Sequence, residues 1–256
     1  MRWTVLGCSG GIGGESCRTT SFLLDDDVLL DCGTGVADMS LDALARVDHV
    51  FLTHAHFDHI ASLPLLADSI SELRERPVVV HGRAETLQAL RQHVFNGTMW
   101  PDFTRLPSPA APTLQLVELS AGETVQLDGG RRVAALPAWH GVPALAYAID
   151  GHGRRLVFSG DTCFEQGFVA ALNALGSIDH LIIEAAFPDE QCELAREAGH
   201  LHPQSLRQLL DALTAEPQVH VSHLKPGREG RILDGIAGCP GRLLPSALRH
   251  RDIIEF

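Results

Sequence analysis

The feature that most constrains this chain is the run HAHFDH at residues 54–59, which directly follows an apolar segment at residues 49–53. The apolar segment predicts a short buried strand that ends at the first histidine. Side chains alternate along extended backbone, so the first two histidines project to the same side and can reach one ion. The last two polar residues, at the start of the next helix, can turn toward a second ion. We therefore predict four metal ligands here: His54, His56, Asp58 and His59.

Three further residues of metal-ligand type stand where predicted strands end: His140, Asp161 and His223. A single histidine at a strand end is more often a hydrogen-bonded structural residue, but the first cluster makes a ligand role the better interpretation. A carboxylate can bridge two ions, whereas an imidazole cannot, so we expect Asp161 to be the bridge. The other ligands divide into a first set, His54, His56 and His140, and a second set, Asp58, His59 and His223.

The rest of the chain alternates apolar segments with glycine and proline breaks. We expect strands at residues 3–6, 21–24, 28–31, 49–53, 78–81, 115–119, 124–127, 132–137, 145–150, 156–159, 180–183 and 218–221. We expect helices at residues 41–45, 60–74, 84–94, 168–175 and 203–213, a glycine-rich tight loop at 7–14 and an irregular loop at 96–112. Strands in hairpin series with helices between them, once in each half, indicate two sheets packed face to face with helices outside. We expect a single domain over residues 1–256.

The composition limits the partners. The 32 acidic and 20 basic side chains give a net charge of -12 with histidine neutral. This charge opposes nonspecific adhesion to phosphate backbones or anionic membranes, so we do not expect nucleic acid as a partner. The start of the chain has no signal-peptide pattern, and no later run approaches the ~20 apolar residues that span a bilayer, which predicts a cytoplasmic protein. The six cysteines lack CxxC spacing and indicate neither a disulfide framework nor a zinc ribbon.

The order of HxHxDH, a later His, a later Asp and a final His resembles the metallo-β-lactamase superfamily across nearly the whole chain. The resemblance implies an α+β fold, a four-layer αββα sandwich, with a dinuclear zinc site on one edge. Four secondary motifs, at residues 96–103, 183–188, 199–203 and 222–226, resemble the class II cyclic-nucleotide phosphodiesterases. They imply hydrolysis of a 3',5'-cyclic nucleotide, cAMP to 5'-AMP first, as the leading function. Phe57 stands where that family usually has Leu.

The segment from residue 184 to residue 223 also resembles the zinc tRNA 3'-processing nucleases, although the chain lacks their Gly/Lys-rich protruding arm. Cleavage of an RNA 3' end is therefore the alternative function. The nuclease resemblance implies that His200 is the proton donor to the leaving oxygen. Glu184 is its expected orienting partner, and His202 is a second candidate for the donor.

Two Zn²⁺ ions, or Mn²⁺ or Fe²⁺ in their place, would hold a bridging hydroxide as the nucleophile, with Asp58 among the catalytic ligands. We expect the substrate to meet three more side chains: Lys225, Trp100 and Phe103. Lys225 is the only lysine and can steady a phosphate oxygen, whereas the two aromatic rings can stack on a base.

Other interpretations stay open. A thioesterase or lactonase would use the same nucleophile on a carbonyl. A di-iron redox or oxygen-binding protein of this fold tends to have Glu in the place of His56. The sequence leaves open the base preference, the metal and whether two chains form a homodimer.

Overall fold

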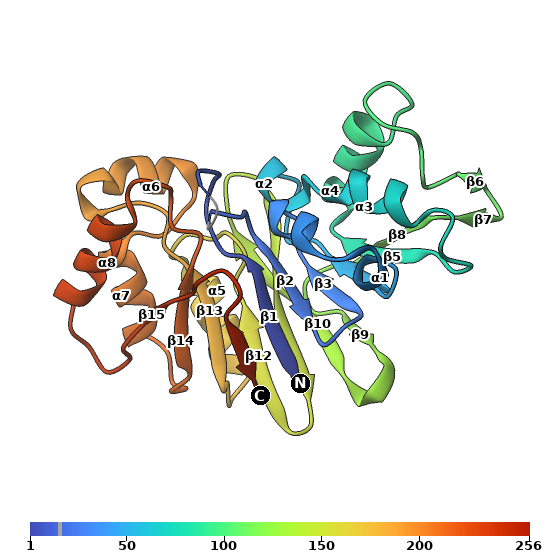
Figure 1. Cartoon of the computed structure of the whole chain (residues 1–256). Helices are drawn as coiled ribbons and strands as arrows, with labels where there is room; N and C mark the ends of the chain where they lie inside the picture. Colours follow the sequence, from blue (N-terminus) through green and yellow to red (C-terminus); the bar gives the residue numbers. More distant parts are fainter. Residues whose placement is uncertain (15–16) are drawn as a thin grey trace.

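The computed structural model of the chain describes residues 1–14 and 17–256. Two seven-stranded sheets face each other, and helices cover their outer faces (Figure 1). The first sheet has the order β16-β1-β2-β3-β4-β5-β8, and the second has the order β15-β14-β13-β12-β11-β10-β9. A separate hairpin pairs β6 with β7.

The strands of the first sheet are β1 (Arg2–Gly7), β2 (Ser21–Leu24), β3 (Val28–Leu30), β4 (His49–Phe51), β5 (Val78–Gly82), β8 (Leu114–Glu118) and β16 (Ile253–Glu255). Those of the second are β9 (Thr124–Gln126), β10 (Arg132–Trp139), β11 (Pro143–Gly151), β12 (Arg154–Phe158), β13 (His180–Glu184), β14 (Gln218–Ser222) and β15 (Ser246–Ala247). The small hairpin consists of β6 (Pro107–Ser108) and β7 (Ala111–Pro112). The helices are α1 (Leu41–Leu44), α2 (Phe57–Ile60), α3 (Leu63–Ile70), α4 (Ala84–Ala89), α5 (Gln166–Ala174), α6 (Cys192–Ala198), α7 (Pro203–Asp211) and α8 (Glu229–Gly238).

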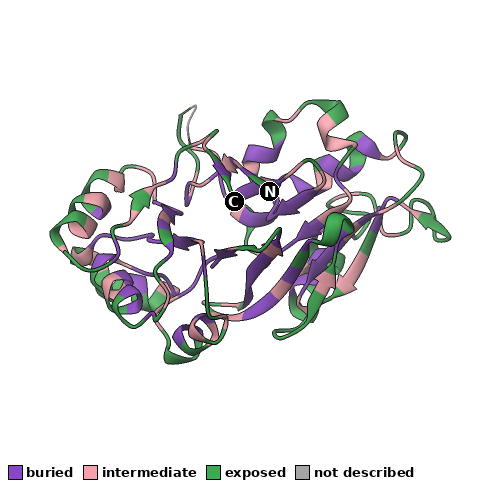
Figure 2. Cartoon of the chain, turned by 90° about the horizontal axis from the view of Figure 1, so that it is seen from below, coloured by how far each residue is buried: buried purple, intermediate pink, exposed green. Residues whose placement is uncertain are grey.

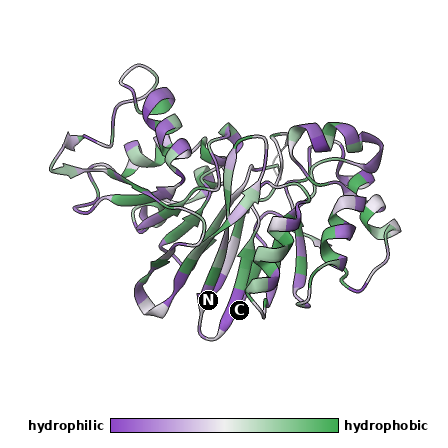
Figure 3. Ribbon diagram, turned by 180° about the vertical axis from the view of Figure 1, so that it is seen from behind, coloured by the Kyte–Doolittle hydropathy of each residue, from purple (hydrophilic) through white to green (hydrophobic). Residues whose placement is uncertain are grey.

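The hydrophobic core has three layers, which follow from the alternation of side chains along the strands. The middle layer lies between the sheets and includes the mutually packed rings of Trp3, Phe22 and Phe158. A second layer joins the first sheet to α3 and α4, and a third joins the second sheet to α5 and α7. The strands between these layers are largely buried, whereas the outer helices present exposed faces (Figure 2). Coloured by hydropathy, the same strands are mostly apolar (Figure 3). The predicted αββα sandwich is confirmed.

The two ends of the chain meet in the first sheet. Strand β16 pairs antiparallel with β1, and the terminal amine of Met1 donates to the carbonyl of Phe256 at 2.6 Å. This pairing closes one edge of the first sheet (Figure 1).

The helix expected at residues 60–74 is two helices, α2 and α3, separated by Ala61 and Ser62. Pro64 lies in the first turn of α3, where its missing amide costs nothing, and it marks a new helix start rather than a continuation. Helices α6 and α8 and strands β15 and β16 were not expected. In the part of the chain that the structure describes, each helix is too short or too polar to cross a membrane.

Candidate metal centre

The seven predicted ligands converge where strands of the two sheets end. The turn after β4 leads into α2 and carries the HAHFDH run, and the other three ligands follow β10, β12 and β14. Their metal-binding atoms form two neighbouring groups, each with all atoms within 4.8 Å of one another: His54, His56, His140 and Asp161 in one, and Asp58, His59 and His223 in the other.

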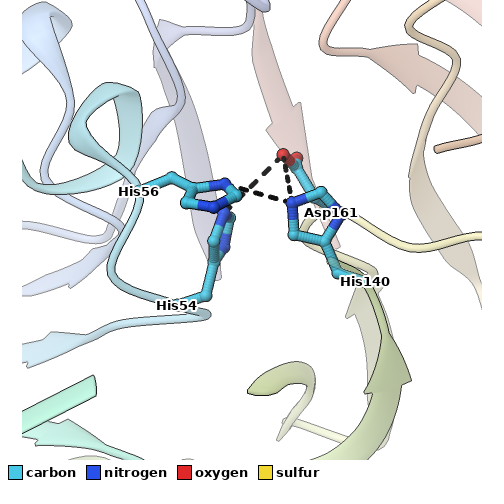
Figure 4. A group of neighbouring side chains, drawn as sticks. All are labelled: His54, His56, His140 and Asp161. Atoms are coloured by element: carbon cyan, nitrogen blue, oxygen red, sulfur yellow. Dashed lines mark hydrogen bonds and ion pairs between the residues drawn. The ribbon is translucent and has the colours of Figure 1, made fainter. Parts of the chain in front are cut away.

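The first group presents ring nitrogens and a carboxylate to a common point (Figure 4). Nδ1 of His140 donates to the carbonyl of Gly199 at 2.9 Å, so Nε2 is the ring nitrogen left to carry a lone pair. That lone pair faces Nδ1 of His56 at 3.1 Å. Oδ2 of Asp161 lies 3.8 Å from His54 Nε2 and 3.9 Å from His140 Nε2. Such a convergence of lone pairs suits a cation.

Asp161 also reaches the second group. Its Oδ2 lies 3.3 Å from His59 Nε2, and its Oδ1 lies 3.2 Å from His223 Nδ1. In the second group, Oδ2 of Asp58 lies 3.7 Å from His223 Nε2 and 3.9 Å from His59 Nε2. Of the two carboxylates among the candidate ligands, Asp161 is thus the one that approaches histidines of both groups.

Three buried ring nitrogens lack a hydrogen-bond partner in the described part of the chain, and this indicates whether the residues of the cluster fit a metal ion. The Nε2 atoms of His54, His59 and His223 are buried and make no hydrogen bond within the described residues. Leaving one such nitrogen unsatisfied costs about 1–3 kcal/mol, so three of them beside the carboxylates of Asp161 and Asp58 need a partner. Nitrogen and carboxylate donors in this arrangement match the preferences of Zn²⁺.

The protonation states of His54, His223 and Asp161 also favour a divalent cation. Burial lowers the pKa of His54 and His223 well below the usual range, and the neighbouring His59 lowers it further, which keeps both rings neutral. Burial alone would raise the pKa of Asp161, but the histidines around it hold that pKa well below its usual range. Neutral imidazoles and an ionised carboxylate are the forms that bind divalent ions. His59 differs, because burial lowers its pKa but Asp161 and Asp31 outweigh burial and raise that pKa well above the usual range, so an ion bound there would displace its proton.

Several residues that were not predicted from the sequence hydrogen-bond to the candidate ligand rings and orient them. Asp31, fully buried after β3, accepts from His59 Nδ1 at 2.7 Å and from the amide of Thr53 at 2.8 Å. Thr20 Oγ1 lies 3.1 Å from His223 Nδ1. Such contacts fix which ring nitrogen faces the metal. Asp31 and His223 both adopt left-handed backbone, with φ of 56° and 59°, which non-glycine residues rarely do.

We expect Asp31→Asn to weaken metal binding by about 10- to 100-fold, because an amide cannot accept from both His59 and Thr53 as the carboxylate does. Competition with a chromophoric chelator measures the affinity. The exposed Asp26, on the preceding turn, provides the matched control Asp26→Asn, which should bind metal as the wild type does. An unchanged affinity in a folded Asp31→Asn protein would show that His59 needs no such partner.

The glycine-rich loop closes over His223. A Cβ at Gly10 would lie 2.6 Å from the His223 carbonyl and 2.8 Å from its ring, so only glycine allows this approach. The ammonium of Lys225 donates to the Gly10 carbonyl at 2.9 Å. Lys225 therefore ties down the loop beside the ligand, and in this structure its ammonium is engaged by backbone.

The Glu184–His200 pair lies against the cluster. Nδ1 of His200 donates to Oε1 of the fully buried Glu184 at 2.7 Å, and the ring packs on those of His140 and His223. Burial lowers the pKa of His200, but the charge and hydrogen bond of Glu184 outweigh it and raise that pKa overall. His202 instead pairs with Asp189 at 2.6 Å at the start of α7. Of the two, His200 is the histidine that touches the cluster.

The two aromatic residues expected to meet substrate differ in position. Phe103 is only 6% exposed and packs in the core beneath the first sheet's helices, which leaves no free ring face for a base. The prediction for Phe103 is therefore corrected: the proline-rich loop folds back and buries it. Trp100 is half-buried and lines a cleft beside α2.

Comparison with known proteins gives a family match over residues 27–224, to the Beta-lactamase superfamily domain. Ribonuclease Z of Haloarcula marismortui is 30% identical over 173 residues, which cover 65% of this chain and 52% of the relative. Ribonuclease BN of Escherichia coli O139:H28 is 27% identical over 166 residues, covering 60% of this chain and 51% of the relative. The chain spans about half the length of the curated relatives it matches.

Solved structures match the whole fold. The metallo-beta-lactamase fold protein YhfI from Bacillus subtilis superposes with a TM-score of 0.77 at 18% identity, over 99% of this chain and 98% of that one. Yeast PDE1 gives 0.75 at 19% identity, over 96% and 97% of the two chains. The short form of human tRNase Z gives 0.71 at 20% identity, over 100% and 99%.

Proposed function

Because the chain belongs to the metallo-β-lactamase superfamily, we propose that it is a metal-dependent phosphodiesterase, with an RNA 3' end as its first substrate class. The observation that carries the proposal is the convergence of three unsatisfied buried histidine nitrogens on two carboxylates, with His54 Nε2 and His59 Nε2 beside Asp161 and His223 Nε2 beside Asp58.

Two of the groups of neighbouring donor atoms support the ligand sets proposed from the sequence; a third group joins Asp161 and His223 to His200. His54, His56 and His140 would hold one ion, Asp58, His59 and His223 would hold the other, and Asp161 would contact both. Zinc suits these donors best, with Mn²⁺ or Fe²⁺ as alternatives. When bound, two such ions supply a nucleophilic water at neutral pH and stabilise charge on a phosphoryl oxygen.

The proton for the leaving alkoxide comes, in this proposal, from His200. Its Nδ1 is engaged by Glu184, so the other ring nitrogen, Nε2, is the one available to a substrate. The buried carboxylate of Glu184 favours the protonated ring and fixes its orientation, because it also accepts from the amides of Thr162 and Leu201. The Glu184–His200 pair thus places a general acid with a fixed ring orientation at the edge of the cluster.

The choice of substrate depends on two observations that oppose each other. The curated relatives are ribonucleases, which favours RNA over the cyclic nucleotide that the sequence motifs indicated and makes the expected absence of a nucleic-acid partner doubtful. The net charge of -12 opposes strong binding of a long polyanion and keeps a 3',5'-cyclic nucleotide as the second candidate.

The test compares three substrates with protein loaded with zinc and with metal-free protein. We expect the loaded protein to hydrolyse bis(4-nitrophenyl) phosphate and to release the trailer from a 3'-extended tRNA precursor, with 3',5'-cAMP cleaved more slowly. Product analysis by chromatography identifies the bond that is broken. Hydrolysis of cAMP alone would reverse the order of the two substrates. A protein with two bound ions that cleaves a thioester or lactone and none of the diesters would overturn the proposal.

A further inference from the structure

An apolar cleft of about 600 Å³ is lined in part by the HAHFDH turn, which also carries four of the candidate ligands. One wall consists of residues from the HAHFDH turn, α2 and α3, and the other consists of the end of α4 and the segment that follows it. Ala55 and Phe57 in the first wall alternate along the chain with the ligands His54, His56 and Asp58. The cleft and the metal centre therefore share the HAHFDH turn, and the volume of the cleft suits a small organic group.

The side chains of this cleft are apolar and uncovered. Phe57 is 68% exposed, Met99 is 64% exposed and Leu65 is 52% exposed. Isolated exposed apolar residues need no explanation, but several gathered around one hollow beside a reaction centre indicate a binding site. Among the lining residues only His93 can carry a charge, so the cleft offers no charged group to a phosphate.

We propose that this cleft is the nucleobase subsite of the enzyme, in which the base next to the scissile phosphate stacks on Phe57 and packs against Met99 and Trp100. The inference rests on the proposed phosphodiesterase function. Aromatic groups in both walls, Phe57 and Trp100, favour a planar ring over an aliphatic chain, because every base has a π-face that stacks on an aromatic ring. With so few polar lining groups, the subsite binds bases with little discrimination among them.

The kinetic test uses three diesters that share the 4-nitrophenolate leaving group and differ in the other ester. These are thymidine 5'-(4-nitrophenyl phosphate), the abasic deoxyribose analogue and n-octyl 4-nitrophenyl phosphate. We expect the zinc-loaded wild type to prefer the thymidine ester over the abasic one in kcat/KM. Phe57→Ala should reduce that preference by about 5- to 100-fold, the loss that one base–aromatic stack gives, and Phe57→Trp should restore it. Leu244→Ala, at an 81% exposed leucine outside the cleft, is the control and should keep the preference.

A binding measurement separates this inference from the proposed function. Thymidine 5'-monophosphate should quench tryptophan emission of the zinc-loaded protein, and Trp100→Phe should remove most of the quenching, although Trp3 and Trp139 remain. If no diester is cleaved but this quenching is found, the subsite stands and the reaction is wrong. If diesters are cleaved with no preference for the base and no Trp100-dependent quenching, the function stands and the subsite is overturned. A preference for the octyl ester that Phe57→Ala removes would assign the cleft to an aliphatic group and also overturn the proposal.

Discussion

Replacement of Asp161 by alanine is expected to remove metal binding and hydrolysis together. Its two carboxylate oxygens lie 3.2–3.9 Å from nitrogens of four histidines, drawn from both ligand groups. Without it, buried imidazoles from both groups would face one another with no negative charge between them. Each bound ion stabilises the transition state by several kcal/mol, so we expect the rate to fall by at least about 1,000-fold.

Two measurements on one sample test this expectation. Elemental analysis after gel filtration gives the metal content per chain, and hydrolysis of bis(4-nitrophenyl) phosphate gives the rate. Asp26→Ala, at an exposed aspartate far from the cluster in sequence, controls for the loss of one carboxylate. If Asp161→Ala retained both ions and the wild-type rate, Asp161 could not be the shared ligand. Retention of one ion with a reduced rate would place Asp161 on a single ion and contradict the bridging assignment.

The candidate ligands were predictable because each follows a strand that the hydrophobic pattern reveals. Strand ends meet at an edge of a sheet, and two facing sheets bring two such edges together. His140 follows β10 and His223 follows β14, so their convergence with the HAHFDH turn is a consequence of the sandwich. The division into two groups followed from alternation within the turn and from the capacity of a carboxylate to bridge.

The supporting residues were not predictable in the same way. Asp31 contacts the ring of His59 and Thr20 contacts the ring of His223, whereas Thr53 donates to Asp31. A single polar residue at a strand end carries no periodic signal. Helix α8 was missed because Gly230, Gly235 and Gly238 lower its helical propensity, although packing of the buried Ile232 on the second sheet compensates.

The net charge alone does not decide the partner. It sums every carboxylate, including Asp58 and the buried Asp161, whose charges a bound cation would offset. Recognition of a phosphodiester depends on the local field at the site, where seven nitrogen and oxygen donors face one region.

His200→Ala is expected to retain both ions and to lower turnover on substrates with alkoxide leaving groups by about 100- to 10,000-fold, the usual contribution of a general acid. The matched control is His202→Ala, because His202 is two residues away and pairs with Asp189 rather than with Glu184. A loss of turnover in His202→Ala with none in His200→Ala would transfer the role to His202.

Comparing leaving groups shows whether His200 donates a proton or only supports the neighbouring ligand rings. The 4-nitrophenolate ion departs without a proton, whereas a ribose alkoxide does not. His200→Ala should therefore slow bis(4-nitrophenyl) phosphate hydrolysis much less than cleavage of RNA or cAMP. A structural role would slow both equally, because the ring packs against His140 and His223 whatever the substrate.

The pH profile tests the role of Glu184. A general acid acts in its protonated form, so turnover of an alkoxide substrate falls as the pH rises through the pKa of His200. Burial lowers that pKa, and Glu184 raises it by charge and hydrogen bond, with a net increase. Glu184→Gln removes the charge, so the fall in turnover should move to lower pH while metal content stays constant.

The hydrogen bonds from the amides of Thr162 and Leu201 can persist to the glutamine carbonyl only in part, so circular dichroism should accompany the profile. A shift to higher pH, or none with an unchanged rate, would mean that Glu184 does not set the protonation of His200.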